Sequence, residues 1–193
     1  LPQNVPANEF LNLEGQKLST SRNWAVWLHE YIERWPGRQD ELRYALASIL
    51  PEFKDSEFTW KDFQDKNNNE LVSILGNFVQ RVFVLCHKFH DGRVPEPTDG
   101  NDPGRVRTIL FNSLRITAAL SVLLEPFLPF TAEKLRRMLG LGALTWEDAL
   151  RAGLVVPGAA LGKPEHLFKP IDDEAIKAEV DRLHATQPQP TAP

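Results

Sequence analysis

The chain has 193 residues, 42% of them hydrophobic and 25% charged, with 22 lysine and arginine residues against 26 aspartate and glutamate residues and a formal net charge of −4. This composition is that of a folded domain and excludes wholesale disorder, and no uninterrupted apolar run reaches the roughly 20 residues of a membrane-spanning helix. The single cysteine excludes a disulfide framework and a cysteine-built zinc site. Because the charge balance gives no sign of a nucleic-acid partner, such a function has to come from local motifs.

The amino-terminal stretch, residues 1–23, is polar and predicts extended chain that runs into a loop. Apolar and polar residues alternate from Phe10 to Leu13, which predicts a short edge strand, and Gly15 then opens the loop. The hydroxyl of Ser21 is suited to capping a helix. The helix predicted after it has apolar residues at helical spacing, namely Trp24, Trp27, Leu28 and Tyr31.

Two helices are predicted in the middle of the chain. After Pro36-Gly37, the first runs from Asp40 to Ile49 and stops at Pro51. The second is the longest helical pattern in the sequence, because it begins at Thr59 and continues to about Phe89 without an internal proline. Its predicted apolar stripe repeats with the period of a helix and consists of Leu71, Ile74, Leu75, Phe78, Val82, Leu85 and Phe89.

The carboxyl-terminal half is also predicted to be helical. Residues 95–104 are rich in proline, glycine, asparagine and aspartate and are typical of a linker. Helices are predicted over 106–124, from a Thr131 cap to Gly140, from Thr145 onward, and from Asp172 to His184, whereas 155–170 has the pattern of a loop. The predicted fold is therefore mainly α, an antiparallel helix bundle with little strand.

The first candidate site is a polar segment that combines cations with hydroxyls. It contains Lys17, Ser19, Thr20, Ser21 and Arg22 beside the predicted start of a helix. Lysine, hydroxyls and free N–H groups are the groups that bind a polyphosphate. The alternative interpretation is a polar loop with an ordinary serine cap, which the spacing alone does not exclude.

The second candidate site lies on the long predicted helix. At about 100° per residue, Asn77, Arg81 and Lys88 fall on one narrow face beside the apolar stripe. A planar amide and a forked guanidinium one turn apart are suited to hydrogen-bonding the edges of unpaired bases and to stacking on them. The alternative is a helix-surface pair, or an Arg81 held in a salt bridge.

The remaining candidates are weaker. His87 and His90 are three residues apart, but no third ligand is nearby, so we interpret them as solvated histidines at a helix end and predict no metal site. Cys86 lies in the middle of the helix and is predicted to be an inert buried thiol.

Several motifs occur in an order typical of one enzyme family. Lys17-Leu18-Ser19-Thr20-Ser21 resembles the KMSKS signature of class I aminoacyl-tRNA synthetases. The stretch from Asn4 to Lys17 is similar to the methionyl-tRNA synthetase family, as are residues 40–44, 68–72, 75–81, 126–135 and 167–172. The resemblance covers nearly the whole chain.

The resemblance implies a domain organisation and a function. Residues 1–55 would be the KMSKS-like loop and stem-contact region, residues 56–185 an α-helical anticodon-binding domain of the class Ia type, and residues 186–193 a flexible tail. The only methionine is Met138, so we expect the sequence to be the C-terminal part of a longer cytoplasmic methionine–tRNA ligase. The fold that carries the HIGH motif and the zinc-bearing insertion would then lie upstream, and this part alone would be inactive.

Site roles follow from the resemblance as well. Lys17, Ser19, Thr20 and Ser21 would assist catalysis, with Lys17, Thr20 and Ser21 contacting ATP while methionine attacks its α-phosphate to give methionyl-adenylate. Asn77 and Arg81 match the residues that read the first base of the CAU anticodon, and we assign Lys88 to the same anticodon surface. The implied partners are tRNA(Met), ATP and methionine, with ATP as a substrate, no resident cofactor or metal in this chain, and no membrane.

The sequence also departs from the family pattern. Thr20 occupies the position of the second lysine of the signature, so Lys17 and the hydroxyls, with Arg22, would carry more of the phosphate contact. The linker over 95–103 is shorter than in the family, and no tryptophan occupies the place of the one that stacks on an anticodon base. Two alternatives remain open: a non-catalytic helical RNA-binding or scaffold module derived from a synthetase, and a sister class I synthetase for another hydrophobic amino acid.

Overall fold

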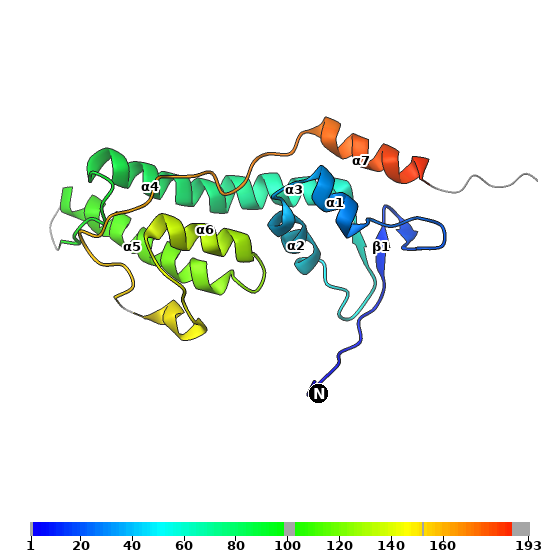
Figure 1. The fold of residues 1–193 in the computed structure, drawn as a ribbon, viewed down its shortest axis with the longest axis horizontal. Coiled ribbons are helices and arrows are strands. Elements are labelled where there is room, and N and C mark those ends of the chain that lie inside the picture. The colour runs from blue at the N-terminus through cyan, green and yellow to red at the C-terminus, as the bar shows by residue number, and fades with distance from the viewer. Residues whose placement is uncertain (1, 99–102, 152, 187–193) are drawn as a thin grey trace, which may run out of the picture. The chain divides into compact units, whose positions relative to one another are not determined.

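The computed structural model describes residues 2–98, 103–151 and 153–186 (Figure 1). The chain divides into two compact units, one formed by residues 1–69 together with 170–193 and the other by residues 70–169. The family-derived boundaries at residues 55 and 185 remain predictions. The predicted tail lies outside the described residues from 187 onward, as do residues 99–102 of the predicted linker.

A small sheet opens the first unit. Its strands are β1 (Leu11–Leu13), β2 (Gln16–Lys17) and β3 (Ser56–Phe58), in the order β2-β1-β3, with β1 antiparallel to β2 and parallel to β3. The predicted strand is confirmed, but its assignment as an edge strand was wrong, because β1 pairs on both sides. Glu14 and Gly15 connect β1 to β2 with φ values of 47° and 74°, the left-handed conformation that a two-residue hairpin turn requires.

Helices α1 (Leu28–Arg34), α2 (Gln39–Ala47), α3 (Trp60–Asp65) and α7 (Asp173–Ala185) complete this unit. The predicted helix starts at Thr59 and Asp172 are confirmed, since each side chain accepts a hydrogen bond from the backbone N–H three residues later. The helices enclose an aromatic core in which Tyr31, Trp35 and Trp60 stack with ring centroids 6.2–6.4 Å apart. This core holds α1, α3 and the sheet together.

The start of α1 differs from the prediction. Ser21 does not cap a helix: Asn23 adopts φ 53°, and Trp24 pairs with Ser19 in an antiparallel bridge. The helix therefore begins only at Leu28. The helical spacing of the apolar residues was misleading, because Trp24 is buried by a β-type contact and Leu28 is largely exposed.

Helical backbone continues from α3 through η1 (Lys66–Gly76), an 11-residue π-helical stretch, into α4 (Asn77–Phe89). The predicted helix to Phe89 is confirmed, but its apolar stripe is only partly right. Leu71 and Val82 are buried, whereas Ile74 and Phe89 are 66% and 60% exposed. A π-helix has wider turns than an α-helix, so a periodicity of 3.6 residues carried across η1 assigns the wrong face.

The second unit is a helical bundle of α4, α5 (Pro103–Leu123), α6 (Pro129–Leu139) and the short 3₁₀ helix η2 (Trp146–Leu150). Its buried residues come from all three long helices, for example Phe83, Leu114 and Leu135. The predicted stop at Gly140 is confirmed by its left-handed conformation at the end of α6, but Thr131 is buried inside α6 and is not its cap. Pro129 instead occupies the first turn, where its missing N–H costs no hydrogen bond.

Helix α5 combines apolar and cationic residues. Its stretch Gly104–Leu123 is long and apolar enough to cross a bilayer by length and composition alone. In the bundle one side of α5 packs against α4 and α6, and its exposed residues include arginines. The core helix of a bundle passes the same test of length and composition, so this feature does not assign a membrane.

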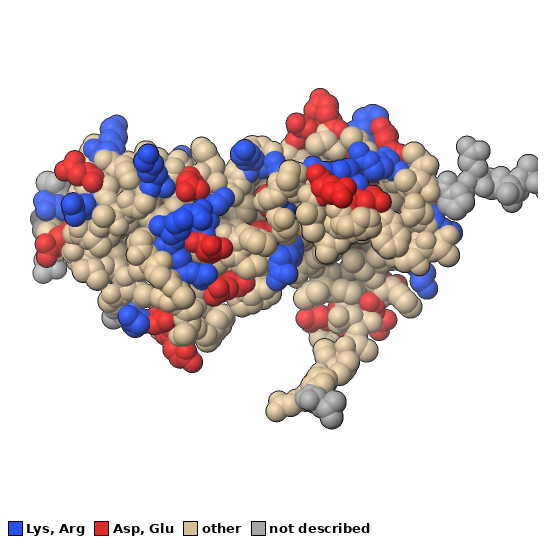
Figure 2. Space-filling model, in the orientation of Figure 1, with Lys and Arg blue, Asp and Glu red and all other residues tan. Residues whose placement is uncertain are grey.

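Charges of both signs are interspersed on the molecular surface. Figure 2 shows lysine and arginine side chains beside aspartate and glutamate on the face in view. Ion pairs of the described residues include Arg136 with Glu125 at 2.9 Å and Arg137 with Glu165 at 3.6 Å. Recognition of an anionic partner therefore has to rest on the local placement of particular side chains.

Candidate functional site

The first candidate site is a tight hairpin that follows β2. Ser19 and Trp24 close it with two backbone hydrogen bonds of 3.0 and 2.8 Å. Thr20 and Ser21 lie in the turn with exposed side chains, and the hydroxyls of Ser19 and Ser21 are 3.2 Å apart. The three hydroxyls that the sequence singled out therefore lie on one turn, and we name residues 19–24 the hydroxyl hairpin.

One cation precedes the hydroxyl hairpin and another lies within it. The side chain of Lys17 is exposed, and its Nζ lies 4.3 Å from the ring centre of Phe10. The guanidinium of Arg22 folds back and donates a hydrogen bond of 3.1 Å to the carbonyl of Lys17. Lys17 itself belongs to strand β2 and not to a loop, and its exposed side chain lies over the Phe10 ring.

The second candidate site is the exposed face of α4. Asn77 is the first residue of the helix, and Arg81 donates from Nε to its Oδ1 at 2.9 Å. Both side chains are exposed, and among the described residues no carboxylate lies within ion-pair distance of Arg81. Lys88 is exposed on the same face two turns further on, with Nζ 5.1 Å from the ring centre of Phe89. In the described part of the chain, Arg81 therefore forms the helix-surface pair that the alternative interpretation named and no salt bridge.

A groove adjoins this face where η1 gives way to α4. It is lined by Gly76, Asn77, Gln80 and residues 166–168. Within the described part of the chain, the buried Oε1 of Gln80 has no hydrogen-bond partner. The sequence pattern did not single out Gln80, which lines the same groove as Asn77.

The groove depends on the close packing at Gly76. A Cβ at this position would lie 3.0 Å from the carbonyl oxygen of Leu71 and 3.7 Å from the ring of Phe168. Glycine thus allows the last π-helical turn to close directly before Asn77.

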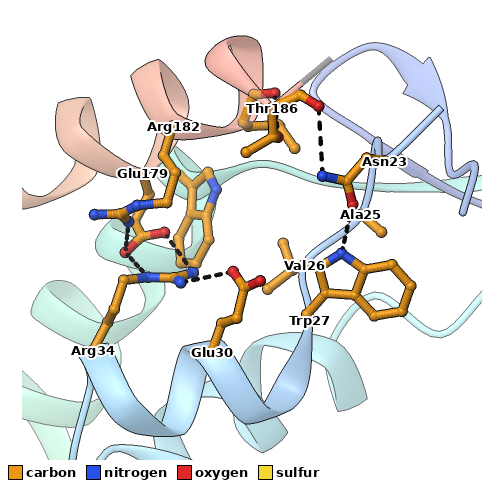
Figure 3. Close-up of a pocket in the computed structure, with 11 residues that line it drawn as sticks. Asn23, Ala25, Val26, Trp27, Glu30, Arg34, Glu179, Arg182 and Thr186 are labelled. Atoms are coloured by element: carbon orange, nitrogen blue, oxygen red, sulfur yellow. Dashed lines mark hydrogen bonds and ion pairs between the residues drawn. The ribbon is translucent and has the colours of Figure 1, made fainter. Parts of the chain in front are cut away.

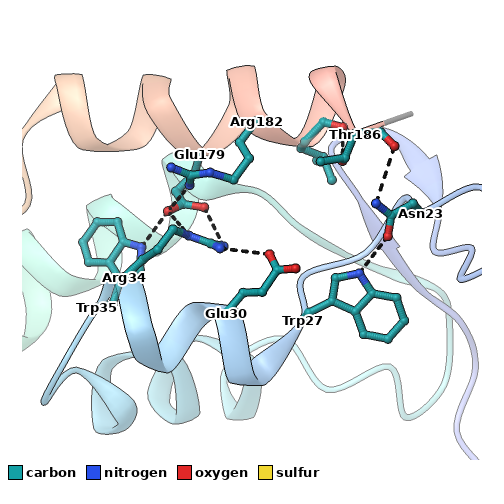
Figure 4. A network of polar contacts seen from close by, with 9 residues as sticks. Asn23, Trp27, Glu30, Arg34, Trp35, Glu179, Arg182 and Thr186 are labelled. Carbon is teal, nitrogen blue, oxygen red and sulfur yellow. Dashed lines mark hydrogen bonds and ion pairs between the residues drawn. The ribbon is translucent and has the colours of Figure 1, made fainter. Parts of the chain in front are cut away.

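A buried carboxylate network lies beside the hydroxyl hairpin (Figures 3 and 4). Glu179 of α7 accepts hydrogen bonds of 2.9 Å from Arg34 Nε and from Trp35 Nε1, and Arg182 lies 2.8 Å from the same carboxylate. Burial favours the neutral acid, but these donors outweigh it and hold the pKa of Glu179 below its usual value. Sequence reasoning missed this network, because its partners are about 145 residues apart.

His87 lies in the last turn of α4, and His90 directly follows the helix. Within residues 2–98, 103–151 and 153–186, no group of three or more His, Cys, Asp or Glu side chains could hold a metal ion. The Nδ1 atom of His87 lies at a hydrogen-bonding distance of 2.9 Å from the Phe83 carbonyl.

Two known family models match this chain. Residues 1–83 match the family of class I tRNA synthetases (M), and residues 76–188 match the anticodon binding domain of methionyl tRNA ligase. The chain belongs to the methionyl-tRNA ligase family. The hydroxyl hairpin falls in the first match, Asn77 and Arg81 fall where the two matches overlap, and Lys88 falls in the second match alone.

Curated relatives extend the match over nearly the whole chain. The methionine–tRNA ligases of Phocaeicola vulgatus and Flavobacterium psychrophilum are 46% and 45% identical, over 97% of this chain. This chain spans only 36% of their length. The alignment with the Phocaeicola vulgatus ligase runs over 242 residues, so that ligase has residues that this chain lacks.

Solved structures show the same fold. The free methionyl-tRNA synthetase of Mycobacterium tuberculosis matches with a TM-score of 0.72 at 19% identity, over 89% of this chain and 44% of that chain. The same enzyme in complex with methionyl-adenylate matches with a TM-score of 0.71 at 22% identity, over 87% of this chain and 44% of that chain. The mainly α architecture expected from the sequence is thus confirmed.

Proposed function

We propose that this chain acts as the C-terminal part of a methionine–tRNA ligase, in which the α4 face binds the anticodon arm of tRNA(Met). The observation that carries the proposal is the Asn77–Arg81 pair, exposed on a helix without carboxylates, inside the region that matches the anticodon binding domain. In the complete protein, the hydroxyl hairpin would contact ATP.

The chemistry of the α4 face suits an unpaired base. Arg81 has further N–H donors beyond the one that it shares with Asn77, and the amide of Asn77 offers both a donor and an acceptor. Held one turn apart, the two groups present a fixed pattern to the edge of a single base, while Lys88 supplies a cation for the phosphate chain. We assign to Asn77 and Arg81 the reading of the first base of a CAU anticodon.

The hydroxyl hairpin suits a transferring phosphate. During adenylate formation the methionine carboxylate attacks the α-phosphorus of ATP, and the bond to the bridging oxygen breaks as pyrophosphate leaves. Lys17 would stabilise the negative charge on the leaving group, and the hydroxyls of Ser19, Thr20 and Ser21 would donate hydrogen bonds to its oxygens. With Thr20 in place of a second lysine, Arg22 is the remaining cation on this segment.

These roles make ATP, methionine and tRNA(Met) the substrates of the complete enzyme, which we place in the cytoplasm. No resident cofactor is required by this chemistry.

The test of the anticodon role is the binding of a short RNA hairpin with the CAU anticodon loop to this chain, at fixed salt. Arg81→Ala is expected to weaken binding by about 1–3 kcal/mol and to reduce discrimination against a changed first anticodon base. The matched control is Arg115→Ala on α5, which removes an equal charge from an exposed site on another helix. Equal losses in the two variants, or none in Arg81→Ala, would contradict the proposal.

A further inference from the structure

The end of α7 lies against the base of the hydroxyl hairpin. Trp24, which closes the hairpin, is fully buried, and its ring lies 5.2 Å from that of His184 between centroids. Asn23 donates a long hydrogen bond of 3.5 Å to the carbonyl of Thr186, 163 residues later, and accepts one of 2.8 Å from Trp27 Nε1 (Figure 4). The last two residues of the hairpin are therefore fixed from outside it.

Glu179 fixes α7 itself in place. Its carboxylate is 5% exposed and receives donors from Arg34 and Trp35 at the end of α1, and from Arg182 of its own helix. Because both oxygens are engaged, neither α7 nor α1 can rotate without breaking charge-assisted hydrogen bonds. Figure 3 shows that this network and the Asn23 contacts line the same small pocket between α1 and α7.

The turn of the hairpin has few contacts of its own. The hydroxyls of Ser19 and Ser21 bond to each other, and the backbone N–H of Arg22 reaches Ser19 Oγ at 3.4 Å. Two further bonds of 3.1 Å, from the Asn23 N–H to the Thr20 carbonyl and from the Arg22 guanidinium to the Lys17 carbonyl, involve backbone oxygens and not the hydroxyls. The position of the three hydroxyls therefore depends on the base of the hairpin.

We propose that α7 positions the hydroxyl hairpin, with Glu179 and His184 as positioning residues for the ATP-dependent step. This inference rests on the phosphate-binding role proposed above for the hairpin. It means that a helix at the far end of the sequence, within the stretch that matches the anticodon binding domain, sets the geometry of a segment within the class I synthetase match.

The first test uses this chain and needs no catalysis. Amide hydrogen exchange of Ser19 and Trp24 reports directly on the two bonds that close the hairpin. We expect exchange at both amides to be about tenfold faster in Glu179→Gln and His184→Ala, because the base of the hairpin opens locally more often. The side chain of His184 is exposed, so His184→Ala leaves the core intact even if Glu179→Gln impairs folding.

Matched controls separate positioning from general destabilisation. Asp181→Asn removes a carboxylate from the exposed side of the same helix, where Asp181 pairs with Lys177. This variant is expected to leave amide exchange unchanged. His184→Phe retains a ring against Trp24 and is expected to restore slow exchange. Unchanged exchange in both test variants, or equal acceleration in Asp181→Asn, would overturn the proposal.

The second test uses the complete ligase that contains this chain, assayed by ATP–pyrophosphate exchange. His184→Ala should lower kcat by about tenfold to a hundredfold with an unchanged KM for methionine, because misplaced hydroxyls weaken only the contacts to the reacting phosphate. Fast amide exchange with full kcat would overturn the role in the ATP-dependent step. If Lys17→Ala also retained full kcat, the phosphate-binding role of the hairpin itself would be wrong. If Lys17→Ala lost activity while His184→Ala kept it, only the positioning role of α7 would be wrong.

Discussion

The side-chain amide of Asn68 makes two hydrogen bonds with the backbone of Ile171, which lies 103 residues further along the chain. Its Nδ2 donates to the Ile171 carbonyl at 2.8 Å, and its Oδ1 accepts from the Ile171 N–H at 2.9 Å. This pairing fixes the chain directly before α7 to the side of the π-helical stretch, within the first unit.

Removal of that amide should destabilise the first unit. We expect Asn68→Ala to lower the free energy of unfolding by about 1–3 kcal/mol, because the N–H of Ile171 loses its acceptor. The neighbouring Asn69 is exposed, so Asn69→Ala is the matched control and should change stability little. Urea denaturation measures both, and equal losses would assign the effect to helix propensity alone.

Gly76 gives a second prediction. Alanine at this position should improve helix propensity, yet we expect Gly76→Ala to destabilise the chain by about 1 kcal/mol, since the new Cβ would press against the Leu71 carbonyl. The control is Gly142→Ala, where a Cβ would meet no atom within 4 Å. A stabilised Gly76→Ala variant would show that the π-helical turn relaxes without cost.

The ionisation of Glu179 makes a third prediction. The hydrogen-bond donors around Glu179 lower its pKa in the folded chain, despite burial. The ionised carboxylate therefore stabilises the fold at pH values above its ordinary pKa of 4.5. This stabilisation is lost as the pH falls through the lowered pKa. Stability measured between pH 7 and pH 3 should therefore fall less steeply in Glu179→Gln than in the unchanged chain. Parallel pH profiles for the two proteins would argue against this.

The burial of Cys86 leads to a fourth prediction. Burial raises the pKa of its thiol to about 11, so little of it is thiolate near neutrality. We expect iodoacetamide at pH 8 to modify Cys86 only as fast as the chain opens, and rapidly in urea. Fast alkylation of the folded chain, followed by mass spectrometry, would show that the helix face around Cys86 opens to solvent.

The proposed contact of Lys17 with phosphate leads to a fifth prediction. In the complete ligase, Lys17→Ala should slow ATP–pyrophosphate exchange, because an interaction made mainly in the transition state is lost, while binding of the CAU hairpin RNA stays the same. A Lys17→Ala variant that loses RNA binding but keeps normal ATP–pyrophosphate exchange would contradict the phosphate role.

Much of the fold could be predicted from the sequence, where local chemistry decides it. The caps at Thr59 and Asp172 and the left-handed stop at Gly140 follow from rules that involve only a few neighbouring residues. The long helix to Phe89 could also be predicted locally, because the stretch contains no proline that would end it.

The errors have non-local causes. The bridge between Ser19 and Trp24 and the left-handed Asn23 delay α1 to Leu28, although the apolar spacing indicated an earlier start. The π-helical stretch shifts the buried face beyond Gly76 in a way that no 3.6-residue period reveals. Asn77 and Arg81 could be singled out because both lie on one α-helical stretch, whereas Glu179 could not, as its partners are distant in sequence.

The division of the chain has a consequence for how it is synthesised. Residues 70–169 leave the ribosome before α7, whereas the unit that contains the hydroxyl hairpin is incomplete until α7 has been made. The hydroxyl hairpin therefore reaches its native contacts only after residues 70–169 have been made, because Trp24 packs against His184 and Trp35 donates to Glu179. A truncation after residue 169 would leave the helical bundle complete, whereas the first unit would lack the helix that covers its aromatic core.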